Sequence, residues 1–341
     1  MPVRNEAAFI ERSLDAVLTQ DYPYGRMEVL IADGMSTDAT REIIERLKRH
    51  HPYVAVTVLD NPGRVVSTGI NTALAQAKGE VIVRVDGHTV IAEDYVRECV
   101  AALRRSGADS VGGRMDVVGE GLFGQAEAVA TSSAFGVGGA RFHYSDREEW
   151  VDTVYLGAWL RDVFHRIGLF DEEMVRNQDD EHNYRLRSQG GKILLSPRIK
   201  SIYYNRTTLL SLCRQYFQYG YWKVRVMQKH PRQMRPRQFV PAVFAVALLV
   251  SLLMLPFSTV GKFMFAFVTF FYLFVNFAAS ALAVRKERWQ LLLLLSLAFM
   301  TLHLAYGFGF LTRIVRFWNR WGSYETGANQ PETQAQDVRL L

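Results

Sequence analysis

The first 120 residues alternate short apolar runs with stretches in which apolar residues recur at helical spacing. The apolar runs predict strands over residues 27–33, 54–59, 80–86 and 109–117. The helical spacing predicts helices over residues 7–19, 38–50, 66–77 and 92–106. This alternation predicts an α/β fold, with a doubly wound, mostly parallel sheet covered by helices on both faces.

The chain offers little sequence for the strand that should begin such a sheet. Only Met1, Pro2 and Val3 precede the polar pair Asn5-Glu6. We therefore expect a first strand that is very short or that begins upstream of residue 1.

After residue 119 the pattern becomes irregular, and the glycine-rich stretch 136–139 is typical of a loop near a site. A smaller α/β portion follows, with a helix over 180–189 and strands at 193–195 and 199–204. We expect one catalytic unit over 1–207, divided into a donor half (1–118) and an acceptor half (119–207).

The last part of the chain is different in texture. Residues 208–229 read as an amphipathic helix rich in Tyr, Phe and Trp, which suits a membrane interface or ordinary packing on the domain. Together with a basic linker it fills 208–238. Three apolar runs follow within 239–311, each near the ~20 residues that cross a hydrocarbon core: 239–257, 263–284 and 289–311. Asn276 and His303 interrupt them and are expected to bond neighbouring helices. A polar tail fills 312–341.

Composition adds a charge argument. The 341 residues carry a net charge of +6, and six basic residues gather just before the apolar region: Lys223, Arg225, Lys229, Arg232, Arg235 and Arg237. Their place beside a span favours anionic lipid headgroups over nucleic acid as a partner. The two cysteines have no metal-ligand or redox spacing, and no signal peptide is evident, so we expect a cytoplasmic catalytic domain.

Basic residues between the apolar runs bear on topology. The first break has Lys262, and the second has Arg285, Lys286 and Arg288. This pattern fits an outward first turn and an inward second one. Three full spans, the arrangement we favour, then place Arg313, Arg316 and Arg320 on the far side, against the charge rule. The alternative is a third segment that bends at Gly307 and Gly309 and returns.

Four motifs carry the chemistry. They are Pro2-Val3-Arg4-Asn5-Glu6, Ala32-Asp33-Gly34-Met35-Ser36-Thr37-Asp38, Val85-Asp86-Gly87-His88 and Asn177-Gln178-Asp179-Asp180-Glu181. In this order and spacing the chain resembles family 2 glycosyltransferases of the GT-A fold over about residues 1–230, above all the membrane-bound members that build bacterial exopolysaccharide, such as the succinoglycan group.

The resemblance implies a nucleotide-sugar pocket. Pro2 and Glu6 match residues that line the nucleoside site, and Asp33 matches the acidic residue that bonds the uracil ring. Asp33 and Asp86 each end a predicted strand, so both should face the crevice at the carboxyl ends of the strands.

The resemblance also implies a divalent cation that neutralises the leaving diphosphate. The family holds it with Asp-x-Asp, whereas this chain has Asp86 and His88. An imidazole suits Mn²⁺ better than Mg²⁺, which prefers oxygen, so both metals stay candidates. His88 as a plain loop residue is the alternative.

Inversion at the anomeric carbon needs a base for the acceptor hydroxyl. The family's Glu-Asp motif falls on Gln178-Asp179, which makes Asp179 the expected base, with Asp180 one residue away as the alternative. Repulsion among neighbouring carboxylates raises a pKa and would tune such a base.

These features predict an inverting, multi-pass inner-membrane enzyme that moves a sugar from a nucleotide-diphosphate donor, first of all a UDP-sugar, to a lipid-linked saccharide. The stretch 215–219 lacks the Arg and Trp of the processive members' Gln-x-x-Arg-Trp motif. Single addition is therefore favoured over a processive polysaccharide synthase. A catalytically inactive, nucleotide-sugar-binding scaffold is the other alternative, because His88 and Gln178 depart from the family pattern.

Overall fold

The computed structural model describes residues 1–205, 208–233, 235–284 and 286–318. Most of the predicted tail over 312–341, including Arg320, therefore lies outside the described residues. Arg285 also lies outside them. The first sheet is parallel, with the order β1-β2-β3. Its strands are β1 (Pro2–Val3), β2 (Glu28–Asp33) and β3 (Ala55–Asp60). Within this chain the first strand covers only two residues, which leaves both expectations for its start open.

The second sheet is mixed rather than mostly parallel. Its path is β4-β8-β6-β9-β5, with β7 beside β9, and among these pairs only β6 and β9 run parallel. Its strands are β4 (Val81–Val83), β5 (Thr89–Ile91), β6 (Ser110–Val118), β7 (Glu149–Trp150), β8 (Tyr155–Leu160) and β9 (Ile193–Tyr204). The antiparallel partners come from the irregular region after residue 119, where hydrophobic periodicity gave no direction.

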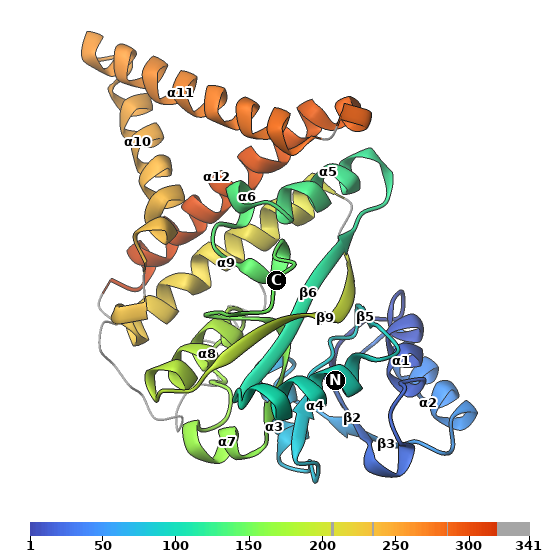
Figure 1. Ribbon diagram of the computed structural model, residues 1–341. Coiled ribbons are helices and arrows are strands. Elements are labelled where there is room, and N and C mark those ends of the chain that lie inside the picture. Colours follow the sequence, from blue (N-terminus) through green and yellow to red (C-terminus); the bar gives the residue numbers. More distant parts are fainter. Residues whose placement is uncertain (206–207, 234, 285, 319–341) are drawn as a thin grey trace.

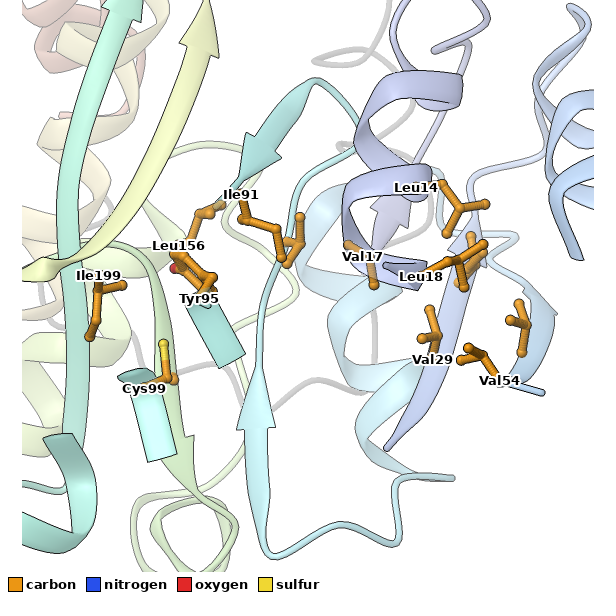
Figure 2. Packing of buried hydrophobic residues seen from close by; sticks show 14 of the residues in the cluster. Leu14, Val17, Leu18, Val29, Val54, Ile91, Tyr95, Cys99, Leu156 and Ile199 are labelled. Atoms are coloured by element: carbon orange, nitrogen blue, oxygen red, sulfur yellow. The ribbon is translucent and has the colours of Figure 1, made fainter. Parts of the chain in front are cut away.

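Helices cover both sheets. They are α1 (Ile10–Leu18), α2 (Thr40–His50), α3 (Val66–Leu74), α4 (Tyr95–Ser106), α5 (Gly121–Thr131), α6 (Ala134–Val137), α7 (Asp162–Ile167) and α8 (Gln178–Ser188). One hydrophobic core joins the two sheets (Figure 2): Leu14 and Leu18 of α1 pack over Val29, while Tyr95 and Cys99 of α4 pack near Ile199. Burial of this continuous core keeps the carboxyl ends of β2 and β4 in one body.

The C-terminal part begins with α9 (Leu209–Lys229), which Thr208 caps by accepting a hydrogen bond from the Ser211 amide. Three apolar helices follow: α10 (Val240–Met254), α11 (Thr259–Ala283) and α12 (Leu292–Arg316). The helical segments that contain them, Pro236–Met254, Thr259–Ala283 and Arg288–Arg316, are long and apolar enough to cross a membrane. In Figure 1, α10 and α11 stand away from the sheets, whereas α12 runs beside α9.

The polar residues inside these apolar helices bond neighbouring segments, as predicted. The Asn276 side-chain amide donates to the Ser296 carbonyl of α12 at 3.0 Å. His303 Nε2 lies 2.9 Å from the Phe135 carbonyl, and its Nδ1 lies 3.1 Å from the Tyr272 hydroxyl.

Candidate active site

A large cleft of about 1760 Å³ connects the sheets with the apolar helices. Its inner wall carries Pro2, Glu6, Asp86, His88, Asp179 and Asp180. Its other end is lined by apolar and aromatic side chains of α10, α11 and α12, among them Phe244, Phe271 and Tyr306. Five of the six residues predicted to hold the donor or metal or to act as base therefore meet in one cavity, together with the alternative base Asp180.

The loop after β1, which is the predicted donor loop, forms part of the wall of the cleft. Asn5 adopts the left-handed conformation with φ of 53°, and its side-chain oxygen accepts a hydrogen bond from the Thr37 amide at 2.8 Å. The Glu6 amide donates to the Thr40 hydroxyl at 2.8 Å. Arg64 and Asn177 also have positive φ and line the same cleft. Strained backbone of this kind concentrates at functional sites.

Asp33 is the predicted donor residue that does not line the cleft. Its side chain is fully buried, pairs with Arg41 and accepts a hydrogen bond from the Ser36 amide at 3.2 Å. Because both carboxylate oxygens have partners inside the fold, the side chain braces the turn after β2 in this structure. The adjacent Gly34 lines the cleft in its place.

Arg84 links the two key carboxylates, and its side chain is only 6% exposed. It binds Asp86 through two parallel contacts, Nε to Oδ1 at 2.7 Å and Nη2 to Oδ2 at 2.9 Å. Its Nη1 pairs with Asp179, 95 residues further along the chain. Although burial opposes ionisation of Asp86, the charge of Arg84 holds the pKa of that carboxyl below its usual range. Asp86 is therefore an anion in the cleft.

His88 lies two residues beyond Asp86, with Nδ1 3.0 Å from Glu6 Oε1. Gly87 permits this contact, because a Cβ there would lie 3.0 Å from the Glu6 side chain. Among the described residues no three His, Cys, Asp or Glu side chains converge as a metal-binding group. A carboxylate has about four acceptor positions, and Arg84 takes two of those on Asp86. Asp86 and His88 thus fit a divalent cation whose remaining ligands come from a diphosphate.

The candidate base lies at the start of α8. Asn177, with φ of 59°, precedes the helix and donates from its side chain to the Tyr219 carbonyl at 2.9 Å, which fixes where the helix begins. The Asp179 side chain is 36% exposed. Burial, reinforced by the charges of Asp86 and Asp180 and opposed by Arg84, raises its pKa above the usual range. A carboxylate that binds a proton more readily is the better base.

Asp180 and the basic residues of α9 pair with each other. Lys223 Nζ lies 2.8 Å from Asp180 Oδ2, and Arg225 Nε lies 2.6 Å from Glu173 Oε1. Lys229 also contacts Glu173, at 2.7 Å. The cluster predicted to face lipid headgroups therefore binds, in large part, carboxylates of the catalytic domain.

Sequence reasoning missed Arg84, Asn61 and Arg64. A charged residue inside the apolar run Val81 to Val85 was a usable signal for Arg84, because a buried charge needs a partner. Asn61 and Arg64 flank the Pro62-Gly63 turn after β3, at the same sheet edge as the motifs.

Comparison with known proteins follows the same lines. The sequence model of glycosyl transferase family 2 matches residues 1–167. Succinoglycan biosynthesis protein ExoA of Rhizobium meliloti (strain 1021) is 34% identical over 232 residues, which are 67% of this chain and 69% of the relative. The chain belongs to glycosyltransferase family 2.

A second relative of this glycosyltransferase is dolichyl N-acetyl-alpha-D-glucosaminyl phosphate 3-beta-D-2,3-diacetamido-2,3-dideoxy-beta-D-glucuronosyltransferase of Methanococcus voltae. It is 27% identical over 64% of this chain and 70% of its own length. Among solved structures, mannosyltransferase PcManGT of Pyrobaculum calidifontis, in complex with GDP-Man and Mn²⁺, has a TM-score of 0.58 at 21% identity, over 93% of this chain and 86% of that one. The structure of Staphylococcus aureus TarS 1-349 has a TM-score of 0.52 at 18% identity, over 89% and 88%. These structures share the GT-A-like fold predicted from the motifs.

Proposed function

We propose that this glycosyltransferase moves one sugar, with inversion, from a nucleoside-diphosphate sugar to a lipid-linked saccharide in the synthesis of exopolysaccharide or another cell-surface glycan. A UDP-sugar is the first candidate donor. The observation that carries the proposal is the cleft, which joins the donor loop, the carboxylates and the apolar helices.

In this reaction Asp179 accepts the proton of the acceptor hydroxyl. The hydroxyl oxygen attacks the anomeric carbon from the face opposite the diphosphate, and the bond to the diphosphate oxygen breaks with its electron pair on that oxygen. Arg84 positions the base, because one guanidinium holds both Asp179 and Asp86. The base is thereby tied to the site where the donor's charge must be neutralised.

Asp86 and His88 are the residues that would hold a divalent cation. When bound with the diphosphate, the cation offsets the negative charge that develops on the leaving group. The Mn²⁺ in the PcManGT complex supports the assignment for this fold. The nitrogen ligand favours Mn²⁺ here.

The membrane end of the cleft supports a lipid-linked acceptor. Phe244 of α10, Phe271 and Tyr272 of α11 and Leu302 of α12 line it, so an apolar chain that enters between the helices reaches the polar part of the cavity. The relative from Methanococcus voltae, which is named for transfer to a dolichyl-linked sugar phosphate, supports an acceptor of this class, and ExoA is a protein of succinoglycan biosynthesis.

Donor turnover by the full chain in detergent tests this function. Hydrolysis and transfer would be followed across UDP-, GDP- and dTDP-sugars with Mn²⁺ or Mg²⁺, using Asp179→Asn as the control without a base. We expect one donor class to be turned over with a requirement for the metal. Binding of a donor without turnover under any condition would instead support an inactive scaffold.

We further propose that α12 lies along the membrane surface and does not cross. Gly220 of α9 and Gly309 of α12 let the two helices approach closely: a Cβ at either would lie 2.0 Å from a carbonyl oxygen of the other helix. At its start α12 packs through Leu295 and Phe299 on α5, and near its end the Gln228 side chain donates to the Phe317 carbonyl at 2.8 Å. Phe317 also packs in one cluster with Val65 and Met174, so both ends of this segment contact the catalytic domain.

Charge makes the same point. The side chains of Lys223 and Arg225 on α9 are ion-paired with that domain, and charges of this kind do not enter a hydrocarbon core cheaply. Because α12 runs along α9, we expect α12 to stay outside the hydrocarbon core as well. The catalytic domain and the end of α12 then share the cytoplasmic side, which places Arg313 and Arg316 where the charge rule favours them. The hairpin of α10 and α11 remains as the inserted part.

Reporter fusions in cells test this topology. A cytoplasm-active and an export-active reporter would be fused after Gln238, within the α10–α11 turn after Phe257, and after Leu341. We expect the first and third sites to behave alike and the second to differ. Export-active signal after Leu341 would establish three full spans and would leave the proposed reaction untouched.

A further inference from the structure

Among the buried oxygen atoms in the wall of the cleft that have no hydrogen-bond partner in the described residues, two lie on α5 and next to it. They are Glu127 Oε2 on α5, in a residue that is 2% exposed, and Asn205 Oδ1 just after β9, in a residue that is 6% exposed. Both residues line the cleft. Asn205 donates from its side-chain amide to the Gly124 carbonyl at 2.9 Å, one helical turn before Glu127. The Asn205 side chain therefore contacts α5 about one helical turn before Glu127.

A buried oxygen without a hydrogen-bond partner destabilises the fold by about 1–3 kcal/mol. Two such atoms at one place in a cleft are explained by a ligand that bonds to both. Among the described residues no hydrogen bond or ion pair joins the Glu127 side chain to the donor loop or to Asp179, so the mechanism above does not use it.

The state of Glu127 narrows the class of ligand. Burial raises its pKa to about 8, so the carboxyl keeps its proton near neutral pH. A neutral carboxyl donates one hydrogen bond and accepts others, while the Asn205 oxygen only accepts. This combination fits hydroxyl groups. It does not fit a metal ion or a phosphate, which require an anion or cations respectively.

Aromatic side chains lie between the Glu127–Asn205 region and the candidate catalytic carboxylates. Tyr216 of α9 packs on the cluster that contains Ala126 and Ala130 and lines the cleft. Tyr203 lines the same cleft, and its ring lies 5.4 Å from the His88 ring. Tyr216 also contacts Tyr219 at a ring separation of 5.4 Å, and the Tyr219 carbonyl binds Asn177 next to the start of α8. Tyr203 and Tyr219 therefore contact two residues beside the candidate catalytic carboxylates, His88 and Asn177.

On its other side, the α5 segment that carries Glu127 packs against α12. Ala126 and Ala130, which flank Glu127 on α5, pack against Leu295, Phe299 and Leu302 of α12. Glu127 therefore lines the cleft on a helix that packs against α12, one of the helices at the apolar end of the cleft.

We propose that Glu127 and Asn205 form a saccharide subsite for the acceptor, in which their side chains hydrogen-bond to sugar hydroxyls beside the Tyr216 ring. A few polar groups among aromatic side chains are typical of a small-molecule site. This inference rests on the proposed function and specifies which part of the acceptor the enzyme recognises.

The full chain in detergent provides the test, with octyl β-glucoside and octyl β-galactoside as acceptors and farnesyl phosphate as a lipid without sugar. Transfer to each is compared with hydrolysis of the same donor. In Glu127→Leu and Asn205→Leu we expect the ratio of transfer to hydrolysis with the preferred glycoside to fall about tenfold or more, as for a lost hydrogen bond of about 1.4 kcal/mol. Glu127→Gln, which still donates and accepts, should restore most of it.

Glu120→Leu is the matched control, since Glu120 precedes the same helix but is exposed and lies outside the cleft. Glu127→Leu removes a buried oxygen that has no hydrogen-bond partner, so the thermal unfolding temperature of this variant should not fall below that of the wild type. Equal losses of transfer and hydrolysis, or transfer only to farnesyl phosphate, would overturn the subsite while sparing the transferase. If the wild-type chain turned over no donor, the proposed function would be refuted, and the proposed subsite would be refuted with it.

Discussion

Replacing Asp179 by Asn removes the proposed proton acceptor but keeps the shape of the side chain and an oxygen that Arg84 can still bind. A positioned general base contributes about 10²- to 10⁴-fold to rate, so the transfer rate should fall by that factor. Donor affinity should change little, because Arg84 keeps its two contacts with Asp86 at 2.7 and 2.9 Å. The lost charge on a side chain that is 36% exposed should cost only about 1 kcal/mol of folding free energy.

Single-turnover transfer and equilibrium donor binding would separate these effects. The matched variant is Asp180→Asn, which removes the 2.8 Å contact with Lys223 but leaves Asp179 in place. Because the pKa of Asp179 is raised, the wild-type rate should climb with pH until that carboxyl is fully ionised and then level off. Normal turnover in Asp179→Asn with loss in Asp180→Asn would move the base by one residue. Normal turnover in both would refute the assignment.

Three further outcomes follow from the same contacts. Arg84→Gln should abolish transfer and lower the unfolding temperature in detergent, because removing one partner from a buried charge cluster costs about 3–5 kcal/mol; an unchanged temperature would mean that the carboxylates need no clamp. His88→Asp should shift metal preference toward Mg²⁺ in the donor-turnover assay, and an unchanged preference or chelator-insensitive donor binding would remove it from the metal site. Glu181, whose pKa is lowered to about 2 because bonds from His230 and Arg185 outweigh its burial, stabilises the fold above its ordinary pKa of 4.5. That contribution disappears as pH falls toward 2, so Glu181→Gln should be less stable at pH 7 and should lose less stability on acidification.

Several strands and the motif positions could be predicted because each is a local property, whereas β5, β7 and β8 were not predicted. β2, β3 and β6 lie within one residue of the predicted bounds, since short apolar runs between amphipathic helices have few other stable solutions. The rule that ligands gather at the carboxyl ends of strands then brought Pro2, Glu6 and Asp86 into one cleft. Asp33 obeys the same rule in position but not in orientation, because Arg41, eight residues along the chain, holds its carboxylate inside the fold.

The long-range partners could not be predicted. Arg84 meets Asp179 across 95 residues, and Lys223 meets Asp180 across 43. Periodicity reports which face of an element is apolar, but it does not report which charge on another element it will face. The same limit applies to the basic residues of α9, whose position next to an apolar run is equally consistent with lipid headgroups and with carboxylates of the domain.

The helix α12 illustrates how composition and contact differ as guides to a membrane helix. All three apolar helices satisfy the length and hydropathy of a span, yet 39% of the most apolar window of α12 is buried in the protein, against 17% and 11% for the α10 and α11 windows. Hydropathy measures transfer out of water, and protein packing satisfies that demand as well as lipid does. The glycines that seemed able to bend the third segment have a different role: Gly307 and Gly309 allow close approach to α10 and α9. Packing on α9 therefore accounts for both the apolar length of α12 and the basic residues at its end, which a spanning helix leaves on the disfavoured side.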